Sequence, residues 1–97
     1  MSKEQFILVV YDISNDKRRT KLHDALVDFG TPVQYSVFEC LLDEKGEQAM
    51  KRKVMKVIKP RVDQVRFYYI CRECVQKVEV TCGKEVLSEK PNAIIVG

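Results

Sequence analysis

The sequence has little of several features on which whole classes of function depend. Its 97 residues include four glycines and a single histidine. Four glycines, all in apparent turns, cannot supply a glycine-rich phosphate loop, and neither a nucleophile elbow nor a His-Glu-x-x-His motif is present. Any acid–base mechanism built on histidine would rest on His23 alone, which helical periodicity places on a solvated flank.

Long apolar runs are absent as well. The longest run, residues 6–11, is far shorter than the ~20 residues that a membrane-spanning helix needs. The first residues, Met-Ser-Lys-Glu-Gln, contain no apolar segment of the signal-peptide type. We therefore expect a cytoplasmic protein without a membrane partner, in which all four cysteines are reduced.

The composition is that of one small globular domain. With 45% hydrophobic and 32% charged residues, the chain can bury only a small core, and pairing with a second copy would add stability. We therefore expect a homodimer. A net charge of +3 permits a nucleic-acid partner without requiring one.

Two helices are predicted, over residues 15 or 16 to 29 and over residues 47–59. Each carries apolar residues on one stripe of period 3.6. The stripe residues are Leu22, Ala25, Leu26 and Phe29 in the first helix, and Met50, Val54, Val57 and Ile58 in the second. Gly30 suits the end of the first helix, a polar turn at residues 43–46 precedes the second, and Pro60 follows it.

The remaining apolar segments predict strands. Residues 6–11 are expected to form a strand that is buried on both faces, and residues 33–42 form either one bent strand or two short ones. Residues 63–71 form another strand. A helical turn at 73–77 and a weak strand at 78–81 follow, and residues 93–96 form a terminal strand. This order predicts an α+β, ferredoxin-like (split βαβ) fold: an antiparallel sheet with two helices on one face. We assign residues 1–83 to this domain. Residues 84–97 form a linker and a terminal strand that pairs with its own sheet or with a partner's.

Asp12 comes directly after the buried strand. Aspartate is disfavoured inside strands, so we expect Asp12 at the rim of the sheet, with a cluster of cations following within one loop and the first helical turns. A carboxylate beside cations suits a phosphodiester, because it offers an oxygen ligand for a divalent ion next to groups that bind phosphate. Taken alone, these residues favour a simpler interpretation, in which Asp12 starts a turn or helps to cap the helix near Asn15.

The cysteines invite a metal or redox interpretation that the spacing does not support. Cys71 and Cys74 form a Cys-x-x-Cys motif and Cys82 follows, but the candidates for a fourth zinc ligand, Cys40 and His23, fall in other predicted elements. The two charges inside the motif, one Arg and one Glu, nearly cancel, which leaves no positive environment to activate a thiol. We interpret the cysteines as small buried hydrophobes with one surface thiol, and expect no structural zinc.

The second predicted helix and its exit are rich in cations, which we interpret as a solvated helix surface. These residues are Lys51, Arg52, Lys53, Lys56, Lys59 and Arg61. Four cations, Lys17, Arg18, Arg19 and Lys21, lie closest to Asp12 in the sequence. In a two-fold symmetric dimer both copies would contribute them, and the combined patch could follow the backbone of a nucleic-acid duplex.

Several motifs occur along the chain in a specific order. They are Val9-Val10-Tyr11-Asp12-Ile13, Asp16-Lys17-Arg18-Arg19, Gly30, the Val-Gln-Tyr-Ser-Val-Phe-Glu of residues 33–39, and the Asp-x-Val-Arg-Phe-Tyr of residues 63–68. Together they closely resemble the small CRISPR-associated protein two family, the non-integrase subunit of the spacer-acquisition machinery. The resemblance covers essentially the whole chain, including the terminal Ile94-Ile95-Val96.

The resemblance implies a ferredoxin-like homodimer in which Asp12 of each protomer faces its symmetry mate, the pair holding one Mg²⁺, with Mn²⁺ as a substitute. By motif match it implies Asp12 as catalytic residue and metal ligand, Arg19 as a cation that faces phosphate, and Tyr11, Ser36 and Phe38 as residues that shape the cleft. From the cation cluster near Asp12 we expect Arg18, Arg19 and Lys21 to bind nucleic acid. One departure is Pro32, which stands where many members have an arginine, and it weakens any phosphate contact at that corner.

Two functions remain open. Members of the family are described as metal-dependent endonucleases on single-stranded RNA or double-stranded DNA, and also as the scaffold that spans DNA between two integrase dimers. The sequence offers no obvious general base, so we expect slow chemistry at best. The integrase subunit is the expected protein partner under either interpretation.

Overall fold

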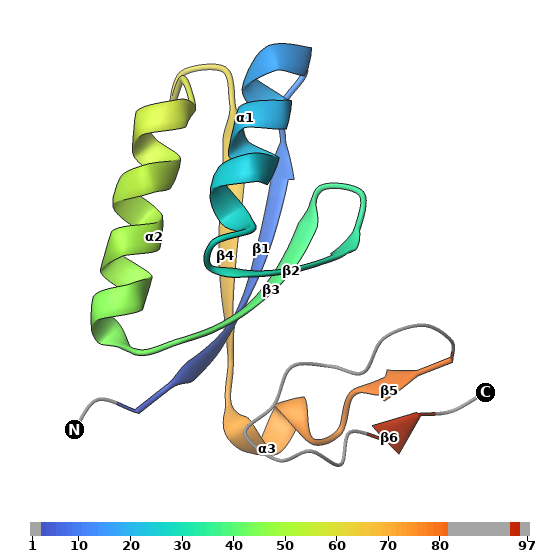
Figure 1. Cartoon of the computed structure of the whole chain (residues 1–97). Helices are drawn as coiled ribbons and strands as arrows, with labels where there is room; N and C mark the ends of the chain where they lie inside the picture. The colour runs from blue at the N-terminus through green and yellow to red at the C-terminus, as the bar shows by residue number, and fades with distance from the viewer. Residues whose placement is uncertain (1–2, 82–93, 96–97) are drawn as a thin grey trace.

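The computed structural model describes residues 3–81 together with residues 94 and 95. Its main layer is a four-stranded antiparallel sheet with strand order β2-β3-β1-β4. The strands are β1 (Gln5–Asp12), β2 (Gly30–Gln34), β3 (Val37–Leu42) and β4 (Gln64–Ile70). Helices α1 (Asp16–Leu26) and α2 (Glu44–Val57) pack on one face of the sheet, which confirms the predicted ferredoxin-like fold (Figure 1).

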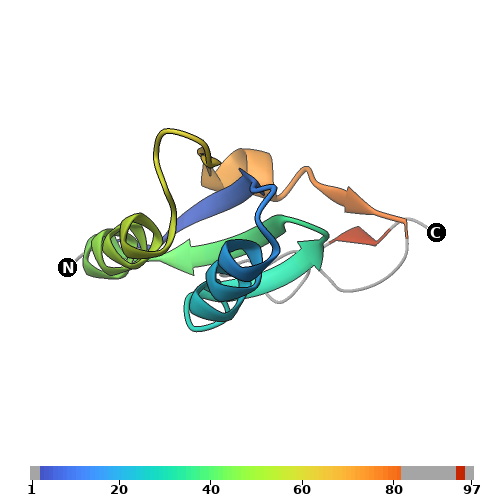
Figure 2. The same cartoon turned by 90° about the horizontal axis from the view of Figure 1, so that it is seen from above.

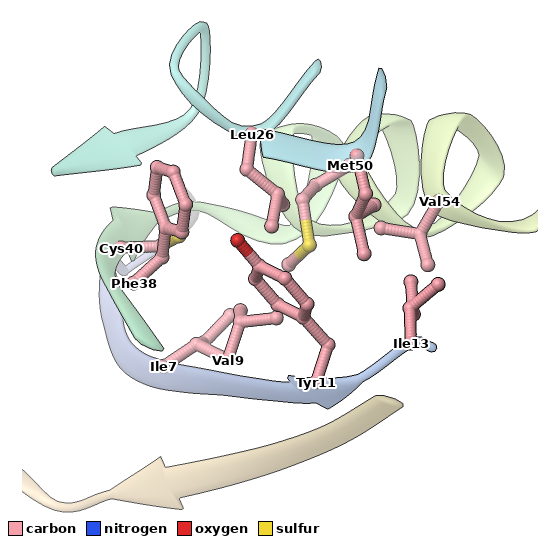
Figure 3. Close-up of a cluster of buried hydrophobic side chains, with 10 residues drawn as sticks. Ile7, Val9, Tyr11, Ile13, Leu26, Phe38, Cys40, Met50 and Val54 are labelled. Atoms are coloured by element: carbon pink, nitrogen blue, oxygen red, sulfur yellow. The ribbon is translucent and has the colours of Figure 1, made fainter. Parts of the chain in front are cut away.

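The core lies between the sheet and the two helices. Side chains alternate along β1, so Ile7, Val9 and Tyr11 point toward the helices, as Figure 3 shows. They meet the predicted stripe residues of the helices, of which Leu22, Ala25, Leu26, Met50 and Val54 are buried. The periodicity of the two helices therefore predicted correctly which faces are buried.

The second face of the sheet is not covered by α1 or α2, and is called the open face below (Figure 2). Phe6, Leu8, Val10 and Asp12 alternate onto this face. Among the described residues, Val75 of the short helix α3 (Arg72–Val75), together with Val78 and Val80, covers the Phe6 end of this face. Val10 is half-buried and Asp12 is exposed, so the opposite end of the open face offers both an apolar and a charged group to a partner.

The predicted strand at residues 33–42 is two strands, β2 and β3. They form a hairpin in which Gln34 pairs with Val37 around a two-residue turn of Tyr35 and Ser36. Ser36 has a φ of 67°, a left-handed conformation that tight hairpin turns require and that serine adopts at some cost. The register shifts between Pro32 and Gln34, and this irregularity on an edge strand tolerates the proline, which has no N–H to donate.

The predicted end of the first helix was wrong. Asn15 caps α1 by accepting a hydrogen bond from the Arg18 N–H, but the helix ends at Leu26 instead of residue 29. Gly30 is not a helix-ending residue either, because it belongs to β2. A Cβ atom at Gly30 would lie 2.3 Å from the Glu39 carbonyl oxygen and 2.5 Å from Cys40 Sγ. Glycine therefore allows β2 to approach β3 closely.

The predicted start of the second helix was also wrong, since α2 begins at Glu44 and not at residue 47. The segment predicted as a polar turn is the helix cap and first turn. Asp43 accepts a hydrogen bond from the Gly46 N–H at 2.7 Å, which satisfies one of the free backbone donors at this end. As predicted, α2 ends before Pro60.

Beyond β4 the chain continues through α3 to β5 (Glu79–Val80), which pairs in parallel with β6 (Ile94–Ile95) in a separate two-stranded sheet. The terminal strand predicted at residues 93–96 therefore has its centre in β6, paired here within its own chain. The predicted linker at residues 84–92 and the division at residue 83 lie outside the described residues. Pairing of the terminal strand across a dimer interface stays a prediction.

Candidate functional site

Asp12 is the last residue of β1 and is exposed, as the sequence predicted. It does not cap α1, because Asn15 does. On the open face its cross-strand neighbour is Gln64 of β4, and the next pair along the same face is Val10 with Arg66. The Asp12 side chain makes no hydrogen bond or ion pair with another described residue, so its carboxylate is available to a ligand.

Arg66 is the cation that the structure adds to this site. It is exposed, and its register beside Val10 puts it on the same face as Asp12, one pair further along the strands. Its Nη1 donates to the hydroxyl of Tyr68 at 3.2 Å, the next residue of β4 on that face. In the sequence, Arg66 stood out only as part of a motif. The alternation of side chains along β4, combined with its pairing to β1, indicates that Arg66 lies on the Asp12 face.

One chain alone does not provide a metal site at Asp12. Among residues 3–81, 94 and 95, no group of three or more His, Cys, Asp or Glu side chains is close enough to hold a metal ion. Mg²⁺ accepts one or two carboxylates when waters and phosphate oxygens complete its octahedron. A single Asp12 therefore fits at most one ligand position, and a second copy of the chain would have to supply another.

The three side chains predicted to contact nucleic acid differ in the intramolecular bonds that they form. The Arg18 guanidinium forms an ion pair with Asp63 at 2.7 Å. Arg19 donates to the carbonyl of Ile13 at 2.9 Å and pairs with Asp16. Lys21 is exposed and forms no ion pair with another described residue. Phosphate binding by these three side chains stays a prediction, and for Arg18 and Arg19 it would compete with intramolecular bonds.

A cavity of about 340 Å³ lies beside the hairpin turn, on the helix side of the sheet. It is lined by Tyr11, Arg19, Thr20, His23, Gln34, Tyr35 and Ser36. The Arg19 guanidinium carbon lies 5.9 Å from the centre of the exposed Tyr35 ring, a cation–π contact at the rim. Burial, and then the nearby Tyr35, raise the pKa of the Tyr11 hydroxyl, so Tyr11 stays protonated as a hydrogen-bond donor.

Phe38 and His23 support this cavity in different ways. Phe38 is fully buried and does not line it, but packs beneath with its ring centre 6.4 Å from that of Tyr11. His23 is exposed, as predicted, yet it lines the cavity and meets Phe38 edge-on at 5.2 Å. Sequence analysis missed this role of His23, because the contact depends on how α1 crosses β3.

Asp12 and the cavity lie on opposite faces of the sheet. Tyr11 points toward the helices while the adjacent Asp12 points to the open face, since consecutive strand residues alternate. Two of the predicted site residues, Tyr11 and Ser36, therefore meet at the cavity and not at Asp12. Pro32, exposed on the edge strand β2, adds no cation to either place.

The structure exposes one cysteine more than the single surface thiol that the sequence predicted, so that prediction was wrong. Cys40 is buried, whereas Cys71 and Cys74 are both exposed at the start of α3. Cys71 Sγ accepts a hydrogen bond from the Cys74 N–H at 3.4 Å. The Cys74 thiol and this N–H both lower the pKa of the Cys71 thiol, and the same contact raises the pKa of Cys74. Cys82 lies outside the described residues.

No helix in the described part of the chain is both long and apolar enough to cross a bilayer.

Comparisons with known proteins bear on this arrangement. The family model described as CRISPR associated protein Cas2 matches residues 5–78. A relative from Synechocystis sp., named CRISPR-associated endoribonuclease Cas2 3, is 34% identical over 89 residues, which cover 92% of this chain and 96% of the relative. One from Thermus thermophilus, named CRISPR-associated endonuclease Cas2 2, is 42% identical over 60 residues, or 62% of this chain and 67% of the relative.

A solved structure is similar in both sequence and fold. The crystal structure of Streptococcus pyogenes Cas2 is 31% identical, with a TM-score of 0.70 over 80% of this chain and 99% of the other. The family match spans β1 through α3, the whole of the ferredoxin-like unit described above. The chain therefore belongs to the CRISPR-associated Cas2 family.

Proposed function

We propose that this protein is a cytoplasmic CRISPR spacer-acquisition protein that acts as a homodimer, binds nucleic acid and hydrolyses phosphodiester bonds in the presence of Mg²⁺. The observation that carries the proposal is Asp12, an exposed carboxylate without a partner among the described residues, at the end of β1 on the open face. The names of the relatives, endoribonuclease and endonuclease, support a nuclease and leave RNA or DNA open as substrate.

The metal requirement follows from pairing two Asp12 carboxylates across a two-fold axis. At ~6 Å separation and an effective dielectric constant of 20, two such charges repel by about 3 kcal/mol. The two Asp12 carboxylates would together hold a divalent cation, which would offset that repulsion and leave its other ligand positions to water and phosphate oxygens. When bound, Mg²⁺ or Mn²⁺ supplies charge stabilisation for the phosphoryl group and activates water for attack.

The chain's own residues would bind and orient the substrate. Arg66 lies one pair from Asp12 on the same face and could hold a phosphate beside it. Val10 and Val37, which pair on β1 and β3, offer an apolar surface that excludes water from that end when a second copy covers it. The dimer would thus enclose both Asp12 carboxylates.

A specific observation favours the second candidate function, a DNA-spanning scaffold for the CRISPR integrase subunit with weak or no cleavage. The single histidine of the chain, His23, packs against Phe38 on the helix side of the sheet. It therefore cannot act as a base toward a phosphate at Asp12 on the open face. Gln64 and Arg66, the neighbours on β4, are not bases at neutral pH.

The test is to compare Asp12→Asn with the unchanged protein in two assays, nuclease activity on RNA and DNA, and spacer acquisition in cells. Asn keeps the size of the side chain but loses the charge that holds a divalent ion. Asp28→Asn is the matched control, because Asp28 is an exposed carboxylate in the turn after α1. Cleavage that needs Mg²⁺ or Mn²⁺ and is lost in Asp12→Asn only is the expected result.

The outcomes separate the two functions. Full cleavage by Asp12→Asn would show that the activity belongs to another site or to a contaminant, and the nuclease proposal would fail. Loss of cleavage with normal spacer acquisition would assign the biological role to the scaffold. If Asp12→Asn keeps both cleavage and spacer acquisition at the level of Asp28→Asn, Asp12 is needed for neither function.

A further inference from the structure

We infer that the outer side of α2 and the loop after it form a second nucleic-acid-binding surface, distinct from the Asp12 face. This inference rests on the proposed function only in that it takes a nucleic acid as the partner. The surface is called the α2 basic surface. It consists of Lys45, Arg52, Lys53, Lys56, Lys59 and Arg61, all exposed.

The first argument is the distribution of charge. Residues 48–62 contain six Lys and Arg residues and no Asp or Glu, in a chain whose totals are 17 and 14. The two acidic residues of α2, Glu44 and Glu47, both lie in its first turn. A helix face that is merely solvated commonly mixes both signs in pairs four residues apart, and beyond its first turn this helix does not.

Second, the cations of the α2 basic surface lack intramolecular partners among the described residues: none of the six takes part in an ion pair there. The contrast is Lys51 of the same helix, whose Nζ lies 3.0 Å from Glu47 and 5.0 Å from the centre of the Tyr69 ring. Lys51 therefore stabilises α2 against the edge strand β4, while the six others remain available to a ligand.

The third argument is alignment. Lys45, Arg52 and Lys56 are spaced by seven and four residues, so they follow one line along the helix, opposite the buried Met50 and Val54. At ~1.5 Å rise per residue, the line from Lys45 to Lys56 is about 16 Å long. The helix dipole favours a cation in the last turn of α2 but disfavours one in the first turn. Helix stability therefore does not explain Lys45, whereas binding of an anionic partner does.

The position of this surface separates it from the site at Asp12. α2 packs on one face of the sheet (Figure 1), and strand alternation directs Asp12 to the other face. If two copies associate through their open faces, the α2 basic surfaces face outward on opposite sides of the dimer. The loop after α2 is held against the first turn of α1 by the Arg18–Asp63 ion pair. That contact brings the exposed Lys17 of α1 to the same end.

The surface suits phosphates, because duplex DNA carries about one negative charge per ~1.7 Å of axis and a line of cations releases counterions along it. Nothing in it favours reading of bases: Lys and Arg on a convex helix meet the backbone first. We expect binding that depends strongly on salt and little on sequence. Duplex DNA and RNA share this chemistry, so both serve as probes.

The test compares Arg52→Gln/Lys56→Gln with Lys3→Gln/Lys77→Gln, two exposed cations away from α2. Each double variant lowers the net charge by the same two units, from +3 to +1 per chain. Binding is measured with a 40-base-pair DNA duplex of random sequence and with single-stranded RNA, from 50 to 200 mM salt. Circular dichroism verifies that both variants are folded.

The α2 variant is expected to bind at least tenfold more weakly at 50 mM salt, and its log–log salt slope to flatten by about two for each chain engaged. The control variant should change affinity less than twofold. An equal loss in both variants would assign the effect to net charge, and no loss in either would remove α2 from the interface; each overturns the inference. Polyglutamate is added as a competitor at the same concentration of negative charge as the duplex. If it displaces the duplex from the protein, the surface binds acidic protein as readily as nucleic acid, and the assignment to nucleic acid is overturned.

Failure of this inference differs from failure of the proposed function. If the unchanged protein binds no nucleic acid, both fail together. If it binds, but Arg52→Gln/Lys56→Gln binds equally well, only the α2 basic surface is excluded. The α2 variant should retain any metal-dependent cleavage at saturating substrate, because its changes lie on the far side of the sheet from Asp12.

Discussion

Arg18 and Asp63, 45 residues apart in sequence, form a two-bond ion pair in which Arg18 Nε donates at 2.7 Å and Nη2 at 3.1 Å. The Asp63 carboxylate is buried and accepts a third bond from the Lys59 N–H at 2.8 Å. This pair joins the first turn of α1 to the loop between α2 and β4. Arg18 and Asp63 belong to two different motifs of the family, and their ion pair explains structurally why one chain carries both.

Replacing Asp63 with alanine should destabilise the fold by about 3 kcal/mol, because it leaves the Arg18 guanidinium and the Lys59 N–H without their acceptor. Asp63→Asn should cost less, since the amide oxygen can still accept one bond. Urea denaturation measures both. Asp28→Ala, an exposed carboxylate, is the control and should stay within about 0.5 kcal/mol of the unchanged protein. A change no larger in Asp63→Ala than in the control would contradict the structural role.

The same contact predicts how stability depends on pH. The hydrogen bonds from Arg18, and then the Lys59 N–H, lower the pKa of Asp63 from its ordinary value of 3.8. A carboxyl with a lower pKa in the folded chain stabilises the fold above its ordinary pKa and loses that contribution as pH falls through the folded value. The free energy of unfolding should therefore fall below about pH 4, and Asp63→Asn should make this fall shallower. Identical acid profiles for the two proteins would disprove the link.

The three described cysteines should differ in reactivity. Burial raises the pKa of the Cys40 thiol to about 11, so almost no thiolate forms at neutral pH, and its sulfur is also inaccessible. Cys71 is exposed with a lowered pKa and should react first with iodoacetamide at pH 7.5, followed by Cys74. Peptide mass spectrometry after timed labelling gives the order. Early labelling of Cys40 in the folded protein would show that the β3 core is open.

Dimerisation through the open face should depend on Val10. It is half-buried in the single chain, pairs with Val37 on one side and Arg66 on the other, and lies next to Asp12. Val10→Lys would place a cation in the apolar part of that face and should shift the dimer to monomer in light scattering. Deleting residues 92–97 should weaken the dimer as well if the terminal strand crosses the interface. A stable dimer in the Val10→Lys variant would move the interface elsewhere.

Local sequence signals determined much of the fold. The apolar run of β1 and the helical stripes around Leu22 and Met50 predicted the right elements on the right faces, because hydrophobic periodicity reflects burial directly. Helix ends were predicted less well. Asp43 could equally start a turn or cap a helix, and only the hydrogen bond to Gly46 in the folded chain decides between these. Gly30 resembled a helix-ending glycine, while its actual constraint is the close approach of the Glu39 carbonyl oxygen and the Cys40 sulfur on the neighbouring strand β3.

Motifs that are local in the chain were also enough to predict the family and to place Asp12 at the sheet rim. The surroundings of the candidate residues depend on how the strands and helices pack, and could not be predicted in this way. Strand pairing put Arg66 on the Asp12 face, and helix packing engaged Arg18 with Asp63, whereas Arg52 and Lys56 form no ion pair within the described part of the chain. The physical reason is that a side chain's charge is written in the sequence, whereas its partner is set by contacts between segments far apart along the chain.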